Sequence, residues 1–191
     1  MESIFQWPDL PSLPPVKQPV LVRLVTSGPR SAARQELRLA LRQVLAAWSG
    51  LAPERLPLLE TSRGPQWQGL LADESLDISL SYCDGEGWIG LIRGAVLGID
   101  AMLVQPFAEA ESVARHYLGK PVMERICASR DPAKAFASAW TGLEARLKCL
   151  KRELTEGEER QSGFEKLAAS EIFFKNGVAV TVAMPKETET I

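Results

Sequence analysis

Two long stretches of the sequence carry apolar residues at the three- and four-residue spacing of an amphipathic helix. Ser31 is expected to cap the first helix and Gly50 to end it, and the second is expected to run from Pro132 to Leu154. The first stripe consists of Ala33, Leu37, Leu41, Val44, Leu45 and Trp48. The second consists of Phe136, Ala139, Trp140, Leu143, Leu147, Leu150 and Leu154. Each helix needs an apolar surface to cover its stripe, so we expect each to pack on a small sheet.

Segments typical of β-strands precede the second helix. Residues 20–25 form an apolar run that follows an extended, proline-rich arm at residues 7–19. Glycine-bearing turns then join three segments typical of an antiparallel meander: residues 76–82, 88–93 and 95–103.

The last third of the chain contains a short helix and a hairpin. Residues 107–118 are predicted to be helical. Near the end, Lys175-Asn176-Gly177 is a strong hairpin signal between residues 171–174 and 178–184. With the earlier segments, this order predicts an α+β fold.

The order of elements also suggests two similar lobes. The chain has 191 residues, enough for one compact domain or two small lobes. Helix and strands in the first half are echoed by helices and a hairpin in the second, although no residue-level repeat supports the echo. We therefore predict a pseudo-twofold arrangement in which residues 1–103 form the N-terminal lobe and residues 104–191 the C-terminal lobe, each an antiparallel sheet packed with a long helix.

Composition excludes several functions. The chain has 22 basic and 24 acidic residues, so no global field favours nucleic acid or a membrane surface. Its three cysteines lack paired CxxC spacing, which favours reduced thiols, and its start lacks the basic and apolar regions of a secretory signal. We expect a cytoplasmic protein. The single histidine, His116, excludes a multi-histidine metal site and is expected to be structural.

Two acidic residues are unusual in their context. Asp100 lies in an otherwise apolar strand segment, and Glu144 lies beside the apolar stripe of the second helix, four residues before Lys148. Each also has an ordinary interpretation. Asp100 could cap a turn, and a glutamate four residues before a lysine often forms a solvated helix pair worth about 0.2 to 0.5 kcal/mol.

In order along the chain, these residues form a recognisable pattern. Gly98-Ile99-Asp100 ends a strand, and it is followed on one helix by Phe136, Trp140-Thr141, Glu144-Ala145 and Lys148. Over residues 34–157 the sequence resembles the 4′-phosphopantetheinyl transferases of the Sfp type. The resemblance implies two pseudo-twofold lobes with coenzyme A bound in the cleft between them. It also implies transfer of 4′-phosphopantetheine to a serine of an acyl or peptidyl carrier protein, with release of 3′,5′-adenosine bisphosphate.

The resemblance assigns roles to three residues. Asp100 and Glu144 correspond to ligands of Mg²⁺, which bridges them to the pyrophosphate of coenzyme A. Glu144, or a water that it holds, corresponds to the general base, and Lys148 to a pyrophosphate contact. Mg²⁺ commonly takes one or two carboxylates together with substrate phosphates and waters, so two acids suffice. Mn²⁺ is an alternative.

The coenzyme A contacts are altered relative to the family. The usual Asn-Leu-Ser-His is Ser79-Leu80-Ser81-Tyr82 here, so Ser81 is retained while Tyr82 replaces a cationic contact. Arg63 precedes Gly64-Pro65 where the family has Gly-Lys-Pro, and it is expected to replace the lysine. Arg30 and Arg34 are candidates for the 3′-phosphate, but they also fit a solvated basic helix face.

Three other departures replace polar residues of the family with apolar ones. Met102 stands where a second acid is usual, and thioether sulfur is too soft for Mg²⁺. Val122 stands near a further family acid, with Glu124 two residues away, and Leu143 replaces the lysine before Glu144.

These features leave three hypotheses. The first is an active phosphopantetheinyl transferase, expected to be a monomer. The second is a coenzyme A or carrier-protein binding protein of the same fold with weak or lost transferase activity, which the departures motivate. The third is a structural α+β interaction domain whose acids have no catalytic role. The residues do not specify the carrier protein.

Overall fold

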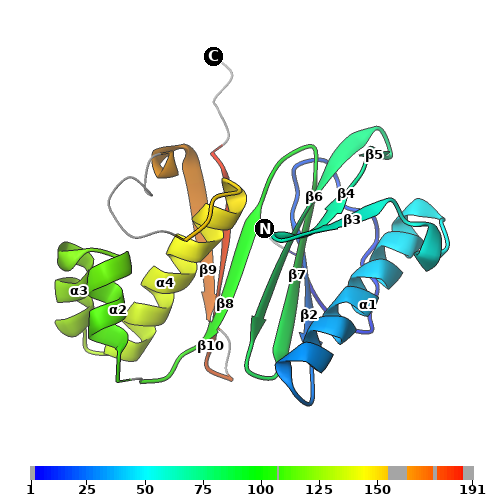
Figure 1. The fold of residues 1–191 in the computed structure, drawn as a ribbon. Helices are drawn as coiled ribbons and strands as arrows, with labels where there is room; N and C mark the ends of the chain where they lie inside the picture. The colour runs from blue at the N-terminus through cyan, green and yellow to red at the C-terminus, as the bar shows by residue number, and fades with distance from the viewer. Residues whose placement is uncertain (1–2, 107, 155–162, 174–175, 187–191) are drawn as a thin grey trace. The chain divides into compact units, whose positions relative to one another are not determined.

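The computed structural model describes residues 3–106, 108–154, 163–173 and 176–186, and the chain divides into two compact units, Met1–Leu97 and Gly98–Ile191. The fold is α+β, as predicted (Figure 1). The division falls at Leu97/Gly98 rather than after residue 103, so the strand that carries Asp100 belongs to the second unit. Each unit is described in turn.

The first unit contains a five-stranded sheet in the order β1-β2-β7-β6-β5. The first two strands are parallel and the other neighbours are antiparallel, so the sheet is mixed and not wholly antiparallel. The strands are β1 (Ser3–Gln6), β2 (Val20–Val25), β5 (Leu70–Leu71), β6 (Glu74–Cys83) and β7 (Glu86–Arg93). The predictions of strands β2, β6 and β7 are confirmed, whereas β1 was not expected.

One long helix, α1 (Arg30–Ser49), packs on this sheet through its predicted apolar stripe. The helix ends at Gly50, whose φ of 70° provides the left-handed C-cap, as predicted. The expected cap at Ser31 is wrong, because the helix begins at Arg30 and includes Ser31, while Pro29 occupies the N-cap position and no side chain caps the helix.

The proline-rich arm is tied to the first unit by side-chain hydrogen bonds. Trp48 Nε1 donates to Pro11 O at 2.7 Å, and Arg93 Nη1 donates to Pro14 O at 3.0 Å. A 3₁₀ turn (Pro53–Arg55) and a two-stranded hairpin complete the unit, the latter formed by β3 (Leu58–Thr61) and β4 (Gly64–Trp67).

The second unit contains an antiparallel sheet in the order β8-β10-β9, formed by β8 (Gly98–Leu103), β9 (Leu167–Phe173) and β10 (Val178–Pro185). The β9–β10 hairpin is confirmed, although Phe174 and Lys175 lie outside the described residues. The predicted meander is wrong in its third strand. β8 pairs with β10, not with β7, because alternation along a strand indicates its faces but not its partner.

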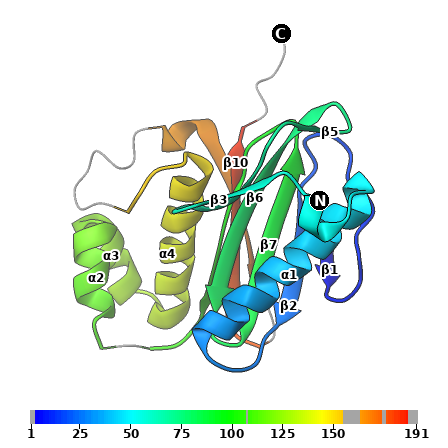
Figure 2. The same ribbon diagram turned by 45° about the vertical axis from the view of Figure 1, so that its right-hand side comes forward.

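Three helices complete the second unit: α2 (Ala110–Tyr117), α3 (Lys120–Cys127) and α4 (Pro132–Cys149). α4 lies along the sheet, with α2 and α3 on its other side (Figures 1 and 2). α4 ends at Cys149, before the predicted residue 154, because Lys151 adopts a left-handed φ of 54° and Arg152 N donates to Leu147 O. A 3₁₀ turn, Phe164–Lys166, precedes β9. The separate helix α3 was not predicted, and residue 107 lies outside the described part of the chain.

Among the described residues, no helix has both the length and the apolar character to cross a membrane.

Candidate functional site

The candidate site lies where α4 packs against β8. A Cβ atom added to Gly98 would lie only 2.0 Å from Ala145 O and 2.4 Å from Cys149 N. The backbone of the helix therefore lies directly on the strand at this glycine, because no other residue has space there. Since side chains alternate along a strand, Asp100 points to the same face as Gly98, towards the helix.

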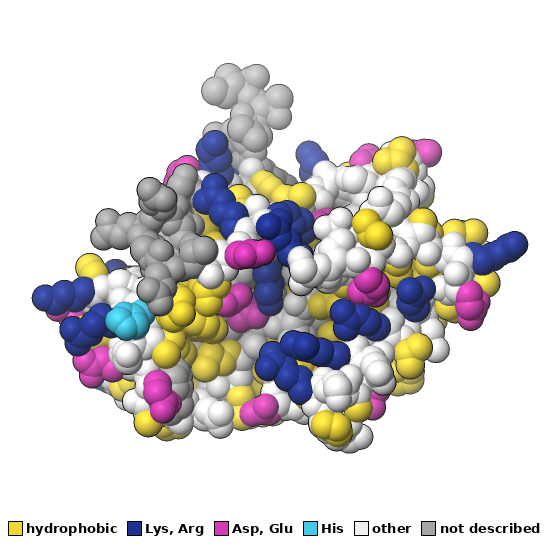
Figure 3. Space-filling view, viewed as in Figure 1, with side chains coloured by type: hydrophobic (Ala, Val, Ile, Leu, Met, Phe, Trp, Pro, Cys, Tyr) yellow, Lys and Arg dark blue, Asp and Glu magenta, His cyan; other side chains and the backbone are white. Residues whose placement is uncertain are grey.

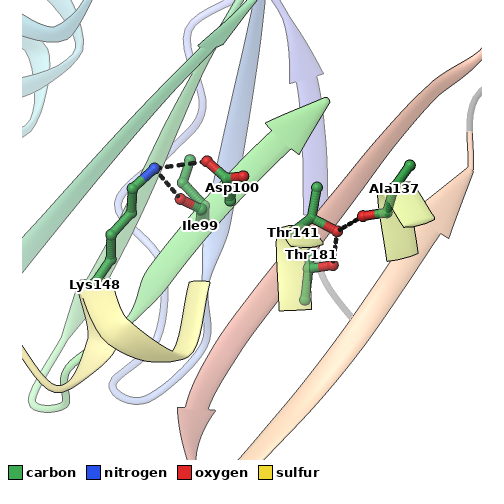
Figure 4. A network of polar contacts seen from close by, with 6 residues as sticks. All are labelled: Ile99, Asp100, Ala137, Thr141, Lys148 and Thr181. Carbon is green, nitrogen blue, oxygen red and sulfur yellow. Dashed lines mark hydrogen bonds and ion pairs between the residues drawn. The ribbon is translucent and has the colours of Figure 1, made fainter. Parts of the chain in front are cut away.

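Asp100 and Lys148 form an ion pair across this contact (Figure 4). Lys148 Nζ donates to Asp100 Oδ1 at 2.7 Å and to Ile99 O at 3.1 Å. The Asp100 side chain is 12% exposed and that of Lys148 is 32% exposed. A charge-assisted hydrogen bond with so little solvent access is stronger than a surface pair.

Glu144 lies one helical turn before Lys148 and is half-buried. Burial raises the pKa of its carboxyl, the negative charge of Asp100 raises this pKa further, and Lys148 opposes both effects. Two carboxylates therefore share one ammonium. We refer to Asp100, Glu144 and Lys148 as the acid–lysine cluster.

The structure thus brings together the three residues to which the sequence assigned chemistry. The alternative in which Asp100 caps a turn is wrong, because the residue lies within β8. The ammonium of Lys148 contacts Asp100 on the neighbouring strand, and it also interacts electrostatically with Glu144, so Lys148 is not paired with Glu144 alone.

The donor set of the cluster can be tested against the implied metal. Carboxylate oxygens are hard ligands that suit Mg²⁺ or Mn²⁺, and the excess negative charge favours a cation. Among the described residues, however, no group of three or more His, Cys, Asp or Glu side chains could hold a metal ion. The residues fit a Mg²⁺ ion whose remaining ligands are phosphate oxygens and waters. They do not fit a metal held by protein ligands alone.

The remaining predicted contacts lie on separate elements of the first unit. Arg34 is exposed on α1, and Arg63 is exposed in the turn between β3 and β4. Ser81 is buried and Tyr82 half-buried, both on β6. Because consecutive strand residues point to opposite faces, Ser81 and Tyr82 cannot both contact a ligand on one face of the sheet.

Three apolar residues that the sequence singled out pack together. Met102, Val122 and Leu143 all belong to, or pack against, the apolar cluster of the second unit that contains Phe136 and Leu147. Leu143 is only 4% exposed. The three replacements therefore contribute apolar packing to one core cluster of the second unit and place no charge at these positions.

An aromatic group belongs to the same apolar cluster. The Trp140 ring stacks on Phe136 at 5.9 Å between centroids and meets Tyr117 edge-on at 5.7 Å. Figure 3 shows hydrophobic side chains gathered beside the single histidine of the chain. His116 is exposed at the end of α2, so it does not belong to the acid–lysine cluster.

Comparison with known proteins adds no family. No protein-family model matches the sequence, and no curated protein matches it. What defines the molecule is therefore an α+β fold with two carboxylates and a lysine at a close helix–strand contact.

Proposed function

We propose that this protein is a phosphopantetheinyl transferase that moves the 4′-phosphopantetheine group from coenzyme A to a serine of an acyl or peptidyl carrier protein. The observation that supports this most is the acid–lysine cluster, in which Lys148 Nζ lies 2.7 Å from Asp100 Oδ1 and Glu144 interacts with both. The order of these residues along the chain is also that of the Sfp-type transferases, which they resemble.

In the proposed reaction, the serine oxygen bonds to the β-phosphorus of coenzyme A, and the bond from that phosphorus to the bridging oxygen breaks. The serine proton passes to Glu144, and 3′,5′-adenosine bisphosphate leaves with the bond electrons. Glu144 suits the role of base because its raised pKa makes it a stronger proton acceptor than an ordinary glutamate. Asp100 and Glu144 would hold Mg²⁺, which offsets the phosphate charge when bound.

Lys148 would stabilise the leaving phosphate. Its ammonium is partly exposed on a flexible stem, so it can contact a phosphate oxygen while staying near Asp100. This positive charge lies where negative charge develops in the transition state, which is the arrangement that lowers the barrier of phosphoryl transfer.

The first unit would supply the other contacts to coenzyme A in this proposal. Arg63 and Arg34 would bind phosphates, and Ser81 or Tyr82 would donate a hydrogen bond. The proposal also includes the pseudo-twofold lobe arrangement, a monomeric state and a cytoplasmic location. Three free cysteines, two of them buried, are consistent with a reducing compartment.

A second candidate function is binding without transfer. Its specific support is Met102, which packs against the apolar cluster of the second unit where the family usually has a second acid. With fewer oxygen ligands, the protein would hold Mg²⁺ weakly while keeping coenzyme A or a carrier protein bound.

Mass spectrometry of carrier proteins separates the two functions. The protein is incubated with coenzyme A, Mg²⁺ and a panel of apo carrier proteins, and each carrier is weighed. We expect a phosphopantetheine adduct on at least one carrier, and about a hundredfold slower transfer by Asp100→Asn, Glu144→Gln and Lys148→Met. Glu111→Gln, an exposed carboxylate on α2, is the matched control and should transfer at the wild-type rate.

The absence of any adduct across the panel would refute transferase activity. In that case calorimetric titration with coenzyme A, with and without Mg²⁺, tests the second function. Saturable binding supports it, whereas no binding of either coenzyme A or carrier protein leaves the third hypothesis, a structural interaction domain.

A further inference from the structure

A groove of about 480 Å³ lies in the second unit, away from the acid–lysine cluster. Residues of α3, α4, β9 and β10 line it, together with Ser129 from the loop between α3 and α4. Neither Asp100, Glu144 nor Lys148 is among them. The volume falls within the range of about 300 to 1,000 Å³ that is usual for small-molecule sites.

Among the residues that the structure describes, the charges that line this groove are positive. Arg125 and Arg146 contribute two guanidinium groups, and no acidic side chain from the described part of the chain belongs to the lining. Two arginines on one groove attract an anion, and the planar fork of a guanidinium matches the two oxygens of a carboxylate.

Arg146 is held in position by its surroundings. Its Nη1 donates to Gly142 O at 2.9 Å, and its guanidinium lies 5.9 Å from the centre of the Phe164 ring. A Cβ atom on Gly142 would lie 3.0 Å from the same Nη1, so the glycine leaves room for this close approach. The cation is therefore preorganised, which lowers the entropic cost of binding an anion.

The hydroxyl groups of the groove differ in whether they can donate to an anion. Thr141 Oγ1 donates to Ala137 O at 2.8 Å and shares a 2.7 Å hydrogen bond with Thr181 Oγ1 (Figure 4). Ser129 Oγ donates to Asp131 O at 3.2 Å. The hydroxyl groups of Thr181 and Ser129 thus already take part in hydrogen bonds within the protein.

Ser138 supplies the hydroxyl that an anion can use. Ser138, Gly142 and Arg146 follow one another at four-residue spacing on α4, so they lie along one face of the helix. The Ser138 hydroxyl and the Arg146 guanidinium therefore border the same side of the groove.

The rest of the lining is apolar. Val122 and Ile126 come from α3, Ala135 and Ala139 from α4, and Ala169 from β9. Such a surface favours a hydrocarbon body over a second polar group.

We propose that this groove binds a short-chain carboxylate of the fatty-acid type, with the carboxylate between Arg125, Arg146 and Ser138 and the acyl chain along the alanines and Ile126. This ligand class combines the single negative charge and the apolar body that the lining selects. The site is separate from the acid–lysine cluster and does not depend on the proposed transferase activity.

Calorimetric titration of the full chain with octanoate tests this. We expect saturable binding by the wild type, and a loss of affinity of about tenfold or more in Arg146→Met and of several-fold in Ser138→Ala, since hydrogen bonds to a charged group are the strong ones. The alcohol 1-octanol and inorganic phosphate should each bind at least about tenfold more weakly than octanoate.

The control separates this groove from a neighbouring hollow. A space of about 540 Å³ beside Met123 and Phe136 also has an arginine, Arg130, in its lining. Arg130→Met should bind octanoate as the wild type does.

Several results would overturn the proposal: no saturable binding of octanoate, unchanged affinity in Arg146→Met, loss of affinity in Arg130→Met instead, or equal binding of 1-octanol or phosphate. If Arg146→Met fails to fold, Gly142→Ala serves in its place. Alanine favours the helix and keeps the charge, but its methyl group displaces Arg146 Nη1, so affinity should still fall several-fold.

Discussion

Each unit packs a long helix against a sheet at a glycine, but the two contacts differ in what the glycine meets. A Cβ atom on Gly87 of β7 would lie 2.7 Å from Leu37 Cδ1, the tip of a side chain on α1. A Cβ atom on Gly98 of β8 would lie 2.0 Å from Ala145 O and 2.4 Å from Cys149 N, which are backbone atoms of α4. The first contact can adjust by rotating a side chain, and the second cannot. The second unit thus places helix side chains directly over the strand, where Lys148 reaches Asp100.

The ion pairs of the two units also differ, in the number of carboxylates that surround the cation. In the first unit, Arg23 pairs with Glu86, which is 5% exposed and also accepts a hydrogen bond from Trp88 Nε1 at 3.2 Å. The printed ion pair there joins one guanidinium to one carboxylate. In the second unit, Lys148 faces two carboxylates, and the pKa of Glu144 is raised. A balanced pair is sufficient for structure, whereas an unbalanced cluster has the capacity to take a further cation.

The largest predicted effect separates the two glycine contacts. Gly98→Ala should lower the free energy of unfolding by about 3 kcal/mol or more, because a methyl group would overlap the backbone of α4. Gly87→Ala should cost about 1 kcal/mol, since the Leu37 side chain can move aside. Urea denaturation followed by circular dichroism measures both. Equal losses in the two variants would contradict the distinction between side-chain and backbone contacts.

The next prediction compares the charges of the Arg23–Glu86 pair with those of the acid–lysine cluster. Glu86→Gln should destabilise the protein by about 3 kcal/mol, because it leaves the Arg23 charge without its buried partner. Lys148→Met should cost about 2 kcal/mol, because Lys148 then no longer offsets the repulsion between Asp100 and Glu144. Thermal unfolding with and without Mg²⁺ distinguishes them. The ion should restore stability to Lys148→Met and not to Glu86→Gln.

Lys120→Met is the matched control for the loss of a lysine. Lys120 forms an exposed pair with Glu124 at 3.7 Å, so its replacement should change stability by less than about 0.5 kcal/mol. If Mg²⁺ stabilised all the variants to the same degree, or none of them, the acid–lysine cluster would have no special capacity for a cation.

The elements that could be predicted from the sequence are those fixed by local patterns. The apolar stripes of α1 and α4, the left-handed Gly50 cap and the hairpin before Val178 all depend on residues close together in the chain. The pairing of β8 with β10 could not be predicted, because the paired residues, such as Asp100 and Thr181, lie far apart along the chain. Nor could the start of α1, where a proline precedes the helix and Ser31 lies within it.

The residues of the candidate site could be predicted from the sequence, but the contacts between them could not. A carboxylate in an apolar strand and a Glu–Lys pair beside an apolar stripe identify the three residues. Only the approach of α4 to Gly98 determines that Lys148 binds Asp100. The groove could not be predicted because α3, which lines it, was not predicted. The four-residue spacing of Ser138, Gly142 and Arg146 can nevertheless be read from the sequence.

The smallest predicted effect concerns the second carboxylate of the cluster. Because the pKa of Glu144 is raised above its ordinary 4.5, the folded protein binds this proton more tightly than the unfolded chain does. The ionised carboxylate therefore reduces stability. This cost is absent below the unfolded pKa and grows as the pH rises through the folded pKa. Glu144→Gln removes it, so without Mg²⁺ the variant should be more stable than the wild type at about pH 8, by less than about 1 kcal/mol, and equally stable at about pH 4.

Urea denaturation at both pH values measures this difference in stability. Glu111→Gln, on the exposed face of α2, is the control for the effect that the loss of an exposed carboxylate has on stability. Added Mg²⁺ should reverse the order at about pH 8, because the ion stabilises only the protein that retains both carboxylates. If Glu144→Gln were less stable than the wild type at about pH 8 without Mg²⁺, the acid–lysine cluster would not carry an excess of negative charge. The cluster would then be a closed ion pair like Arg23 and Glu86, and the two units would not differ in their capacity for a cation.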